Sequence, residues 1–307
     1  MTLILVSVLD ATRRPLFALL AATFFLSSLL SASEGEAPVF IPRAQQFDLL
    51  AQATGRTYRI QIALPERHDP AKKYPVFYVL DGNWYFAPAA VNLAESSGAR
   101  ELQQAIVVGI GYPTDSFGEF ATRRLLELTH SPGPDPQLKT GEADLFLKFL
   151  VDELKPWVNA RYPVDEGKES LFGKSLSGLA VLRVMFRTPA AFDTYIAASP
   201  SIWWNNRDVL ADESQFAAKI KAGERDLRLL ITVAGEEQYR GTDETKLLQS
   251  NRYRMIDNAS ELAVRLAAVN PEKFSVTYAI LPDESHVSVS LASLGRALSF
   301  ALKSPKQ

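Results

Sequence analysis

The chain has 307 residues, of which 47% are hydrophobic and 22% are charged. This length suits one large α/β domain or two small ones, and the composition is that of an ordinary globular protein. The formal net charge of −2 excludes the basic surface that nucleic-acid binding needs, and the absence of cysteine excludes disulfides.

The N-terminal segment predicts an export signal. Arg13 and Arg14 precede an uncharged stretch at 15–33 that is rich in Leu, Phe and Ala. A basic start, an apolar middle and small residues at the end are typical of a secretory signal peptide, which we assign to 1–33. An uncleaved N-terminal anchor is the alternative, although the apolar run is short for a membrane-spanning helix. We therefore expect an exported protein, periplasmic or secreted, that contacts a membrane only if this segment stays uncleaved.

The rest of the chain, 34–307, alternates strand-like and helix-like segments. Apolar, β-branched and aromatic runs predict strands at 58–64, 74–80, 105–110, 170–173, 194–198, 227–233 and 274–281. Amphipathic patterns predict helices at about 144–162, 176–186, 258–268 and 287–302. This alternation predicts a single α/β domain with a mainly parallel central sheet and helices on both faces. A Pro- and Gly-rich stretch at about 113–140 is interpreted as a loop excursion that caps the site or contacts substrate.

The hexapeptide GKSLSG at 173–178 lies between an expected strand and an expected helix. It predicts that Ser175 is a nucleophile on a sharp strand-to-helix turn, which lifts the hydroxyl above the sheet. The amide of Leu176 begins the helix, where it can donate to a developing oxyanion. Ser177 stands where the G-x-S-x-G pattern has glycine. The alternative interpretation is that Ser175 is an ordinary helix cap.

The choice of a general base is narrow, because the chain has three histidines. A serine nucleophile needs a base whose pKa lies near neutrality. His68 lies in a charged turn and His130 in the excursion, whereas His286 follows the last expected strand. In α/β-hydrolases the chain order is nucleophile, acid, histidine, so we predict that His286 is the base. A surface histidine at a helix start is the alternative.

The acid of such a triad is expected after the strand at 227–233, where the turn contains Glu236 and Glu237. Its carboxylate would accept from the imidazole N–H and fix the tautomer. We predict Glu237, with Glu236 as the nearest alternative, and Asp243, Asp283 or a Ser–His dyad without an acid also stay open. The scattered histidines have no metal-ligand spacing, so no metal or other cofactor is expected.

Five segments together resemble the putative-esterase family, which includes esterase D-like and enterochelin (siderophore) esterases. They are YPVFYVLDGN at 74–83, VGIGY at 108–112, RLLELT at 124–129, SPSIWW at 199–204 and TVAGEEQ at 232–238. The resemblance covers most of the chain, from about residue 58 to 286. It implies an α/β-hydrolase fold and the hydrolysis of esters, and its last segment supports Glu237 as the acid.

The resemblance also implies roles for residues that the patterns alone leave unassigned. It places the second oxyanion donor at the backbone amide of Asn83, and it implies that Arg124, Trp203 and Trp204 line the substrate cleft. A core position for the two indoles is the alternative, because indole rings contribute much apolar surface. An ion pair of Arg124 with Glu127 on one helix face is the alternative for the arginine.

The sequence thus predicts a serine ester hydrolase that acts on a small-molecule ester through an acyl-enzyme. A siderophore-type triester or a short acyl ester would be the substrate. An acyltransferase that uses the same residues is one rival interpretation. Another is a non-catalytic exported binding protein, because Lys174 and Ser177 depart from the family's usual G-H-S-x-G-G. A peptidase on this fold is a third.

Overall fold

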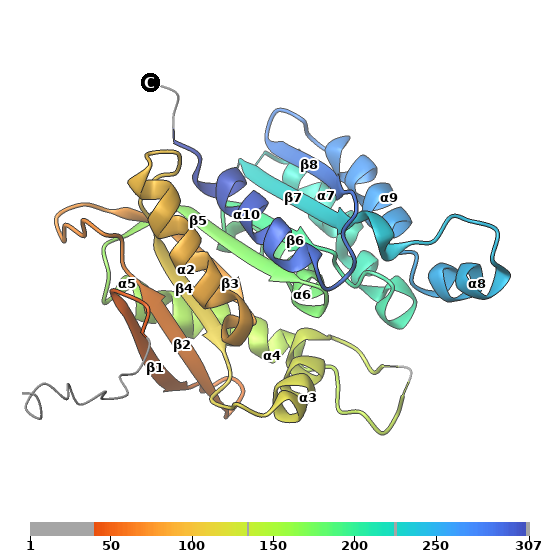
Figure 1. Ribbon diagram of the computed structural model, residues 1–307, viewed down its shortest axis with the longest axis horizontal. Coiled ribbons are helices and arrows are strands. Elements are labelled where there is room, and N and C mark those ends of the chain that lie inside the picture. Colours follow the sequence, from red (N-terminus) through yellow and green to blue (C-terminus); the bar gives the residue numbers. More distant parts are fainter. Residues whose placement is uncertain (1–39, 134, 224–225, 305–307) are drawn as a thin grey trace, which may run out of the picture. The chain divides into compact units, whose positions relative to one another are not determined.

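An eight-stranded sheet runs through the part of the chain that the computed structural model describes, residues 40–133, 135–223 and 226–304 (Figure 1). The expected export signal at 1–33 lies outside these residues. The strands are β1 (Ala44–Leu50), β2 (Thr57–Ala63), β3 (Tyr74–Leu80), β4 (Ile106–Gly111), β5 (Val164–Lys174), β6 (Thr194–Ala198), β7 (Leu227–Ala234) and β8 (Phe274–Leu281). Their spatial order is β1-β2-β4-β3-β5-β6-β7-β8. Strand β2 is antiparallel to β1 and β4, and all other neighbours are parallel.

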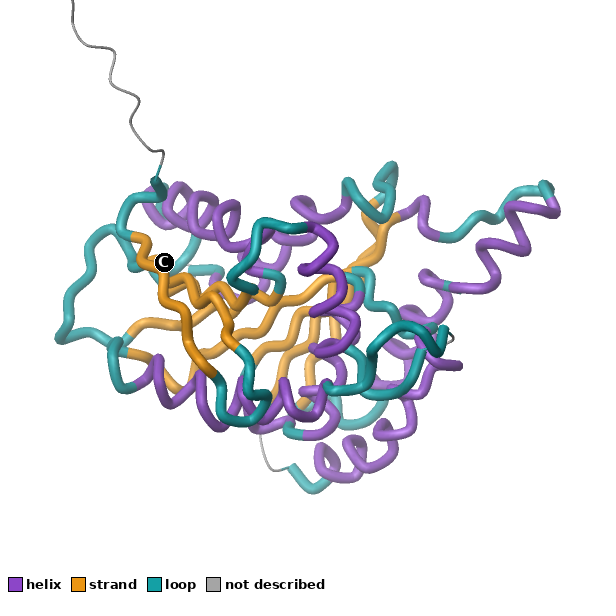
Figure 2. Tube along the Cα trace, turned by 90° about the horizontal axis from the view of Figure 1, so that it is seen from below, coloured by secondary structure: helices purple, strands orange, loops and turns teal. Residues whose placement is uncertain are grey.

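Helices cover both faces of this sheet, as Figures 1 and 2 show. On one face, in front in Figure 1, α2 (Gly82–Gly98) and α10 (Val289–Leu302) pack together against the strands. The other helices contribute to the larger core on the opposite face, except α8, which extends away from the sheet. They are α3 (Phe117–Leu128), α4 (Ala143–Lys148), α5 (Lys155–Asn159), α6 (Leu176–Arg187), α7 (Glu213–Lys221), α8 (Glu244–Tyr253) and α9 (Met255–Ala267). The mainly parallel sheet with two helical layers confirms the predicted α/β-hydrolase fold class.

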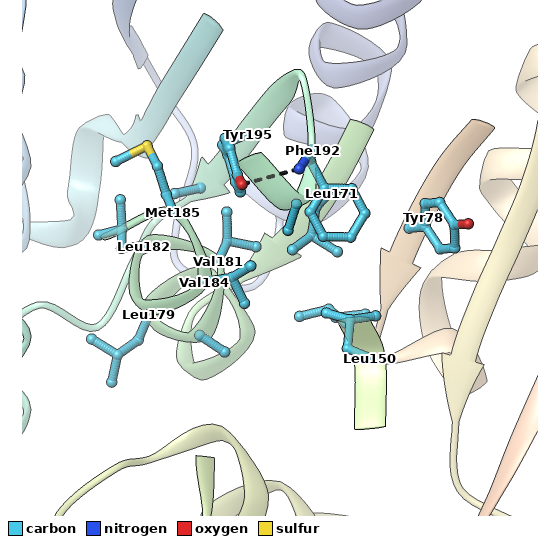
Figure 3. Packing of buried hydrophobic residues seen from close by; sticks show 14 of the residues in the cluster. Tyr78, Leu150, Leu171, Leu179, Val181, Leu182, Val184, Met185, Phe192 and Tyr195 are labelled. Atoms are coloured by element: carbon cyan, nitrogen blue, oxygen red, sulfur yellow. Dashed lines mark hydrogen bonds between the residues drawn. The ribbon is translucent and has the colours of Figure 1, made fainter. Parts of the chain in front are cut away.

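The core explains why the central elements form where they do. Every residue of β3 is buried, as expected for a strand covered on both faces. Figure 3 shows side chains of α6, among them Val181 and Met185, in the same cluster as Leu171 of β5 and Tyr195 of β6. The Tyr195 hydroxyl accepts a hydrogen bond from the amide of Phe192 at 3.2 Å, so its polar atom is paired inside the core. The burial of one apolar side chain of this core, such as Leu171, stabilises the fold by about 1.5–3 kcal/mol.

Five of the strands and α-helices named above were not predicted from the sequence, namely β1, α2, α3, α7 and α8. The excursion expected at 113–140 contains α3, whose start is capped by Ser116, with the Glu119 amide donating to its hydroxyl at 3.3 Å. Helix α2 contains Pro88 and has glycine at both ends, which masks its helical pattern. Strand β1 is an edge strand that carries several exposed polar residues, so its alternation is weak.

The helix expected at 144–162 consists of α4, a π-helical stretch at Phe149–Leu154, and α5. Pro156 is the second residue of α5, and its ring lacks the N–H that a continuous regular helix would need at this point. None of the helices in the described part of the chain has both the length and the apolarity of a membrane-spanning segment.

The sheet topology gathers several polar residues at one edge. Parallel strands β3, β5, β6 and β7 end at the same side, and the residues that follow them are Asp81, Ser175, Ser199 and the turn Gly235–Glu237. In open α/β sheets, ligands bind outside the carboxyl ends of the strands. This edge is therefore where the functional site is expected.

Candidate active site

Ser175 occupies a strained turn between β5 and α6. Its φ of 62° and ψ of −118° lie in a region that side chains other than glycine rarely adopt. The surrounding backbone holds it there, because its amide donates to the Ala198 carbonyl at 2.9 Å and its own carbonyl accepts from Leu179 and Ser201. Strain of this kind persists only where neighbouring contacts determine the conformation, as they do at a nucleophile elbow.

Two glycines make the tight turn feasible. A Cβ atom on Gly173 would lie 2.3 Å from the carbonyl oxygen of Ser177, and one on Gly178 would lie 2.9 Å from that of Ala198. Neither distance is tolerable for a side chain, so the turn requires glycine at both positions. The sequence places the second glycine three residues after Ser175, and the structure accommodates it there.

His286 meets Ser175 from the segment between β8 and α10. Its Nε2 atom lies 3.0 Å from the Ser175 Oγ, although 111 residues separate the two in the chain. The imidazole is 44% exposed, so solvent and substrate can reach it. The structure thus brings together the two side chains that the sequence analysis singled out as nucleophile and base.

Glu237 lies on the other side of the imidazole, in the turn that follows β7. Its Oε1 forms a hydrogen bond with Nδ1 of His286. Its Oε2 accepts from the Ala234 amide at 2.8 Å and from the Ser199 hydroxyl at 2.9 Å. The carboxylate is almost fully buried, so both of its oxygens find partners without water. A carboxylate at Nδ1 requires the proton there and leaves Nε2 free to accept the Ser175 proton.

The other carboxylates that the sequence left open as the triad acid have different surroundings. Glu236 borders the cavity beside Ser175, and its amide donates to the Glu284 carbonyl. Asp243 caps the start of α8, where it accepts from the Lys246 amide at 3.1 Å. Asp283 occupies a turn with φ of 59°.

Two helix starts present backbone amides at this edge. Leu176 is the first residue of α6, and Asn83 is the second residue of α2. The first amides of a helix have no acceptor within that helix, so they are available to an anion. The Asn83 side chain fixes this region, because it accepts from the Tyr112 amide at 2.8 Å and donates to the Tyr112 carbonyl at 2.9 Å. No local pattern around Asn83 indicates this side-chain role.

A cavity of about 410 Å³ opens beside Ser175. Its lining residues are Ser175, Ser201, Trp203, Glu236, Glu237, Tyr253, Met255 and His286. The rings of Trp203 and Tyr253 meet edge to face at 4.7 Å and form an aromatic wall. Trp204 is buried instead, with its ring against Gly133, so the two indoles that the resemblance paired have different surroundings.

Arg124 does not border this cavity. Its Nε donates to Oδ1 of Asp81 at 2.6 Å and a terminal nitrogen donates to Oδ2 at 2.8 Å. The guanidinium also lies 5.4 Å from the ring centroid of Trp84. The bidentate ion pair with Asp81 is the contact that the structure shows for this guanidinium, and the role of Arg124 in the substrate cleft stays a prediction. The alternative pairing of Arg124 with Glu127 is wrong, because Glu127 binds Arg123 at 2.8 Å.

Lys174 precedes Ser175 and is 6% exposed. Burial lowers the pKa of its ammonium group, and the carboxylate of Glu237 acts in the opposite direction.

Within the described ranges, no group of three or more His, Asp or Glu side chains is arranged to hold a metal ion.

A second, larger cavity lies away from these residues. It measures about 840 Å³ and lies near the amino end of β4, between residues 66–67, 97–104 and 303–304. Its volume exceeds that of the cavity at Ser175, but its walls contain neither a nucleophile with a neighbouring base nor a pair of free helix amides. We therefore assign the candidate active site to the carboxyl edge.

The fold and the Ser–His pair at the strand ends define an α/β-hydrolase. The chain matches the model of the "Putative esterase" family over residues 51–277. It is 33% identical over 273 residues to the ferri-bacillibactin esterase BesA of Bacillus subtilis, covering 85% of this chain and 90% of that one. It is 32% identical to the siderophore triacetylfusarinine C esterase of Aspergillus fumigatus, with coverage of 85% and 94%.

A solved structure agrees with these sequence relatives. The siderophore hydrolase EstB from Aspergillus nidulans superposes with a TM-score of 0.76 at 32% identity, covering 88% of this chain and 97% of that one. The chain belongs to the "Putative esterase" family and is a carboxylic ester hydrolase.

Proposed function

We propose that this protein hydrolyses siderophore-type esters through an acyl-enzyme on Ser175. The observation that carries the proposal is the hydrogen-bonded series from Ser175 through His286 to Glu237 at the carboxyl edge of the sheet. The substrate class is supported by relatives whose names specify siderophores and by an aromatic wall that suits a planar substrate arm.

In the first half of the proposed reaction, Ser175 Oγ attacks the ester carbonyl while His286 Nε2 accepts its proton. Glu237 holds the proton on Nδ1 and stabilises the imidazolium that forms. The developing oxyanion is held by the amides of Leu176 and Asn83. His286 then protonates the leaving alcohol, and an acyl-enzyme remains on Ser175.

In the second half, water attacks the acyl-enzyme carbonyl and His286 accepts a proton from it. The same amides hold the second oxyanion, and the carboxylic acid leaves as the Ser175 hydroxyl is restored. An alcohol in place of water would make the enzyme an acyltransferase. Added methanol distinguishes the two, because a transferase would yield mainly methyl ester at concentrations where a hydrolase yields mainly acid.

The decisive experiment compares wild type with Ser175→Ala and Ser201→Ala. We expect the wild type to hydrolyse p-nitrophenyl acetate and a ferric catecholate triester, and to be labelled covalently by a fluorophosphonate. Ser175→Ala should lose turnover and labelling, whereas Ser201→Ala should keep the labelling, although its hydroxyl lies only 3.3 Å from that of Ser175. A wild type no faster than Ser175→Ala would instead favour a binding protein on a hydrolase scaffold.

We also propose that the segment at 1–33 directs export. The basic pair, apolar stretch and small residues described above support this proposal. Expression of the full chain followed by fractionation and N-terminal sequencing tests it. We expect a shortened chain outside the cytoplasm, and a full-length chain retained inside the cell would contradict the proposal.

A further inference from the structure

Ser177 has a buried hydroxyl that bridges two parts of the site. It is the second residue of α6, two positions after the proposed nucleophile, and it is fully buried. Its Oγ accepts from the Lys174 amide at 2.8 Å and lies 2.7 Å from Oδ2 of Asp81. The single hydroxyl proton of Ser177 has two acceptors within reach, Oδ2 of Asp81 at 2.7 Å and the Lys174 carbonyl oxygen at 2.8 Å. A hydrogen bond to an ionised carboxylate is the stronger of the two, so the proton favours Asp81. The hydroxyl thus joins the residue before the proposed nucleophile to Asp81, the residue that follows β3.

Asp81 determines where α2 starts. It follows β3 with φ of 56°, and its carbonyl accepts from the amides of Trp84 and Tyr85 in the first turn of the helix. The Asn83 amide, the second proposed oxyanion donor, belongs to that same turn. The bidentate ion pair with Arg124 also holds the Asp81 carboxylate, and Oδ2 of Asp81 accepts from both Arg124 and Ser177. The orientation of the Asn83 amide therefore depends on how Asp81 is held.

We propose that Ser177 is a positioning residue that couples the nucleophile elbow to the oxyanion turn through Asp81. The inference rests on the proposed acyl-enzyme function. At one end of this hydrogen-bonded path, the Lys174 amide donates to Ser177 and closes the turn around Ser175. At the other end, Ser177 contacts Asp81, which precedes the turn that carries Asn83. The two amides that would hold the oxyanion come from α6 and α2, and the Ser177 hydroxyl links the starts of these two helices.

The link exists because residue 177 is serine, where the G-x-S-x-G pattern has glycine. Glycine at 177 would be compatible with the tight turn, yet it would leave the Asp81–Arg124 pair without a side-chain connection to the elbow. Oxyanion holes contribute to rate because their donors are already in place before charge develops. Loss of the link should therefore lower kcat, while substrate binding at the aromatic wall is unaffected.

The test compares Ser177→Ala and Ser177→Gly with wild type on p-nitrophenyl acetate. We expect kcat to fall roughly 10-fold in both variants, with KM within about 2-fold, because small misplacements of catalytic groups cost rate. The matched control is Ser293→Ala in α10. Ser293 is also fully buried, and its hydroxyl accepts from that of Thr232 at 2.9 Å. The control should lose a similar amount of thermal stability and keep the wild-type kcat.

A double-mutant cycle with Asp81→Asn separates positioning from simple loss of stability. If Ser177 acts through Asp81, the double variant should be no more than about 2-fold slower than Asp81→Asn alone. A kcat for both Ser177 variants equal to that of wild type would overturn the inference, as would fully multiplicative losses in the cycle. An inactive wild type would overturn the proposed function and this inference together, so the two failures are distinguishable.

Discussion

The hydroxyl of Ser199 donates a hydrogen bond to Oε2 of Glu237 at 2.9 Å. The Ala234 amide donates to the same oxygen, and Oε1 is left for Nδ1 of His286. A carboxylate held on both oxygens cannot rotate freely, so it holds the imidazole in the plane that faces Ser175. The orientation of the proposed base therefore depends on Glu237 and not on its neighbour Glu236.

Replacing Glu237 by glutamine should lower kcat by about 10³–10⁴-fold. The amide can donate to Nδ1, which would favour the tautomer that carries its proton on Nε2 and cannot accept from Ser175. Turnover of p-nitrophenyl acetate measures the loss. Glu236→Gln is the matched control, because it removes an adjacent carboxylate that borders the cavity, and its kcat should stay within about 3-fold of wild type. Equal losses in the two variants would contradict this assignment.

Trp203→Ala should weaken selection for substrates with an aromatic arm. The edge-to-face contact with Tyr253 makes a wall for planar groups, and an aromatic contact contributes about 1 kcal/mol beyond burial. We expect kcat/KM for ethyl benzoate or phenyl acetate, relative to ethyl acetate, to fall about 5–10-fold. A variant that loses activity equally on all three esters would show that Trp203 supports the fold and not substrate choice.

Lys174→Met should raise the melting temperature at pH 7 by roughly 2–4 °C, the change expected for a small gain in a domain of this size. Burial lowers the pKa of Lys174 below its usual 10.5, so the folded state disfavours the charged form. The gain in melting temperature of the methionine variant is therefore greatest at pH values below the pKa of Lys174 in the folded state. It shrinks as the pH rises toward 10.5. Thermal melts between pH 6 and pH 10 measure it, and an advantage that grows with pH would refute the prediction.

Lys155→Met is the contrasting case, because its Nζ binds Oε2 of the buried Glu169 at 2.7 Å. Removing the cation leaves a buried carboxylate unpaired, so the free energy of unfolding should fall by about 3–5 kcal/mol at pH 7. Burial raises the pKa of Glu169, so its carboxyl becomes neutral readily and the loss should diminish as the pH falls. Urea unfolding at pH 5 and pH 7 provides the comparison, and a loss that is constant with pH would argue against it.

Arg124→Lys tests whether the guanidinium is structural. Lysine keeps the charge but cannot form the bidentate pair with Asp81, so the free energy of unfolding should fall by about 1.5–3 kcal/mol. Chemical denaturation measures that loss. Unchanged stability together with a raised KM for anionic esters alone would support the expectation that Arg124 contacts substrate.

The features that could be predicted from the sequence are those that a short stretch of residues or the composition reveals. The strand at 74–80 is apolar throughout and bounded by Asp81-Gly82, and His286 could be selected because there are few histidines. The start of α3 carried the signal S-x-x-E at Ser116, which the surrounding Pro- and Gly-rich composition obscured.

Other features depend on contacts that no local pattern reveals. The choice between Glu236 and Glu237 is made by a single turn of 3₁₀ helix, which directs one carboxylate inward. Arg124 and Asp81 are 43 residues apart, so their pairing follows from the packing of α3 beside the end of β3. The same holds for Ser177, whose partner Asp81 lies 96 residues earlier.

The aromatic wall and the proposed reacting groups come from different segments. Tyr253 ends α8, a helix that extends from the sheet in Figure 1, whereas Ser175, Glu237 and His286 all follow parallel strands. Surface segments with few buried contacts accept substitutions and insertions more readily than strand ends in a core. Substitutions in α8 can therefore alter the Tyr253 side of the aromatic wall without disturbing the strand ends that carry Ser175, Glu237 and His286.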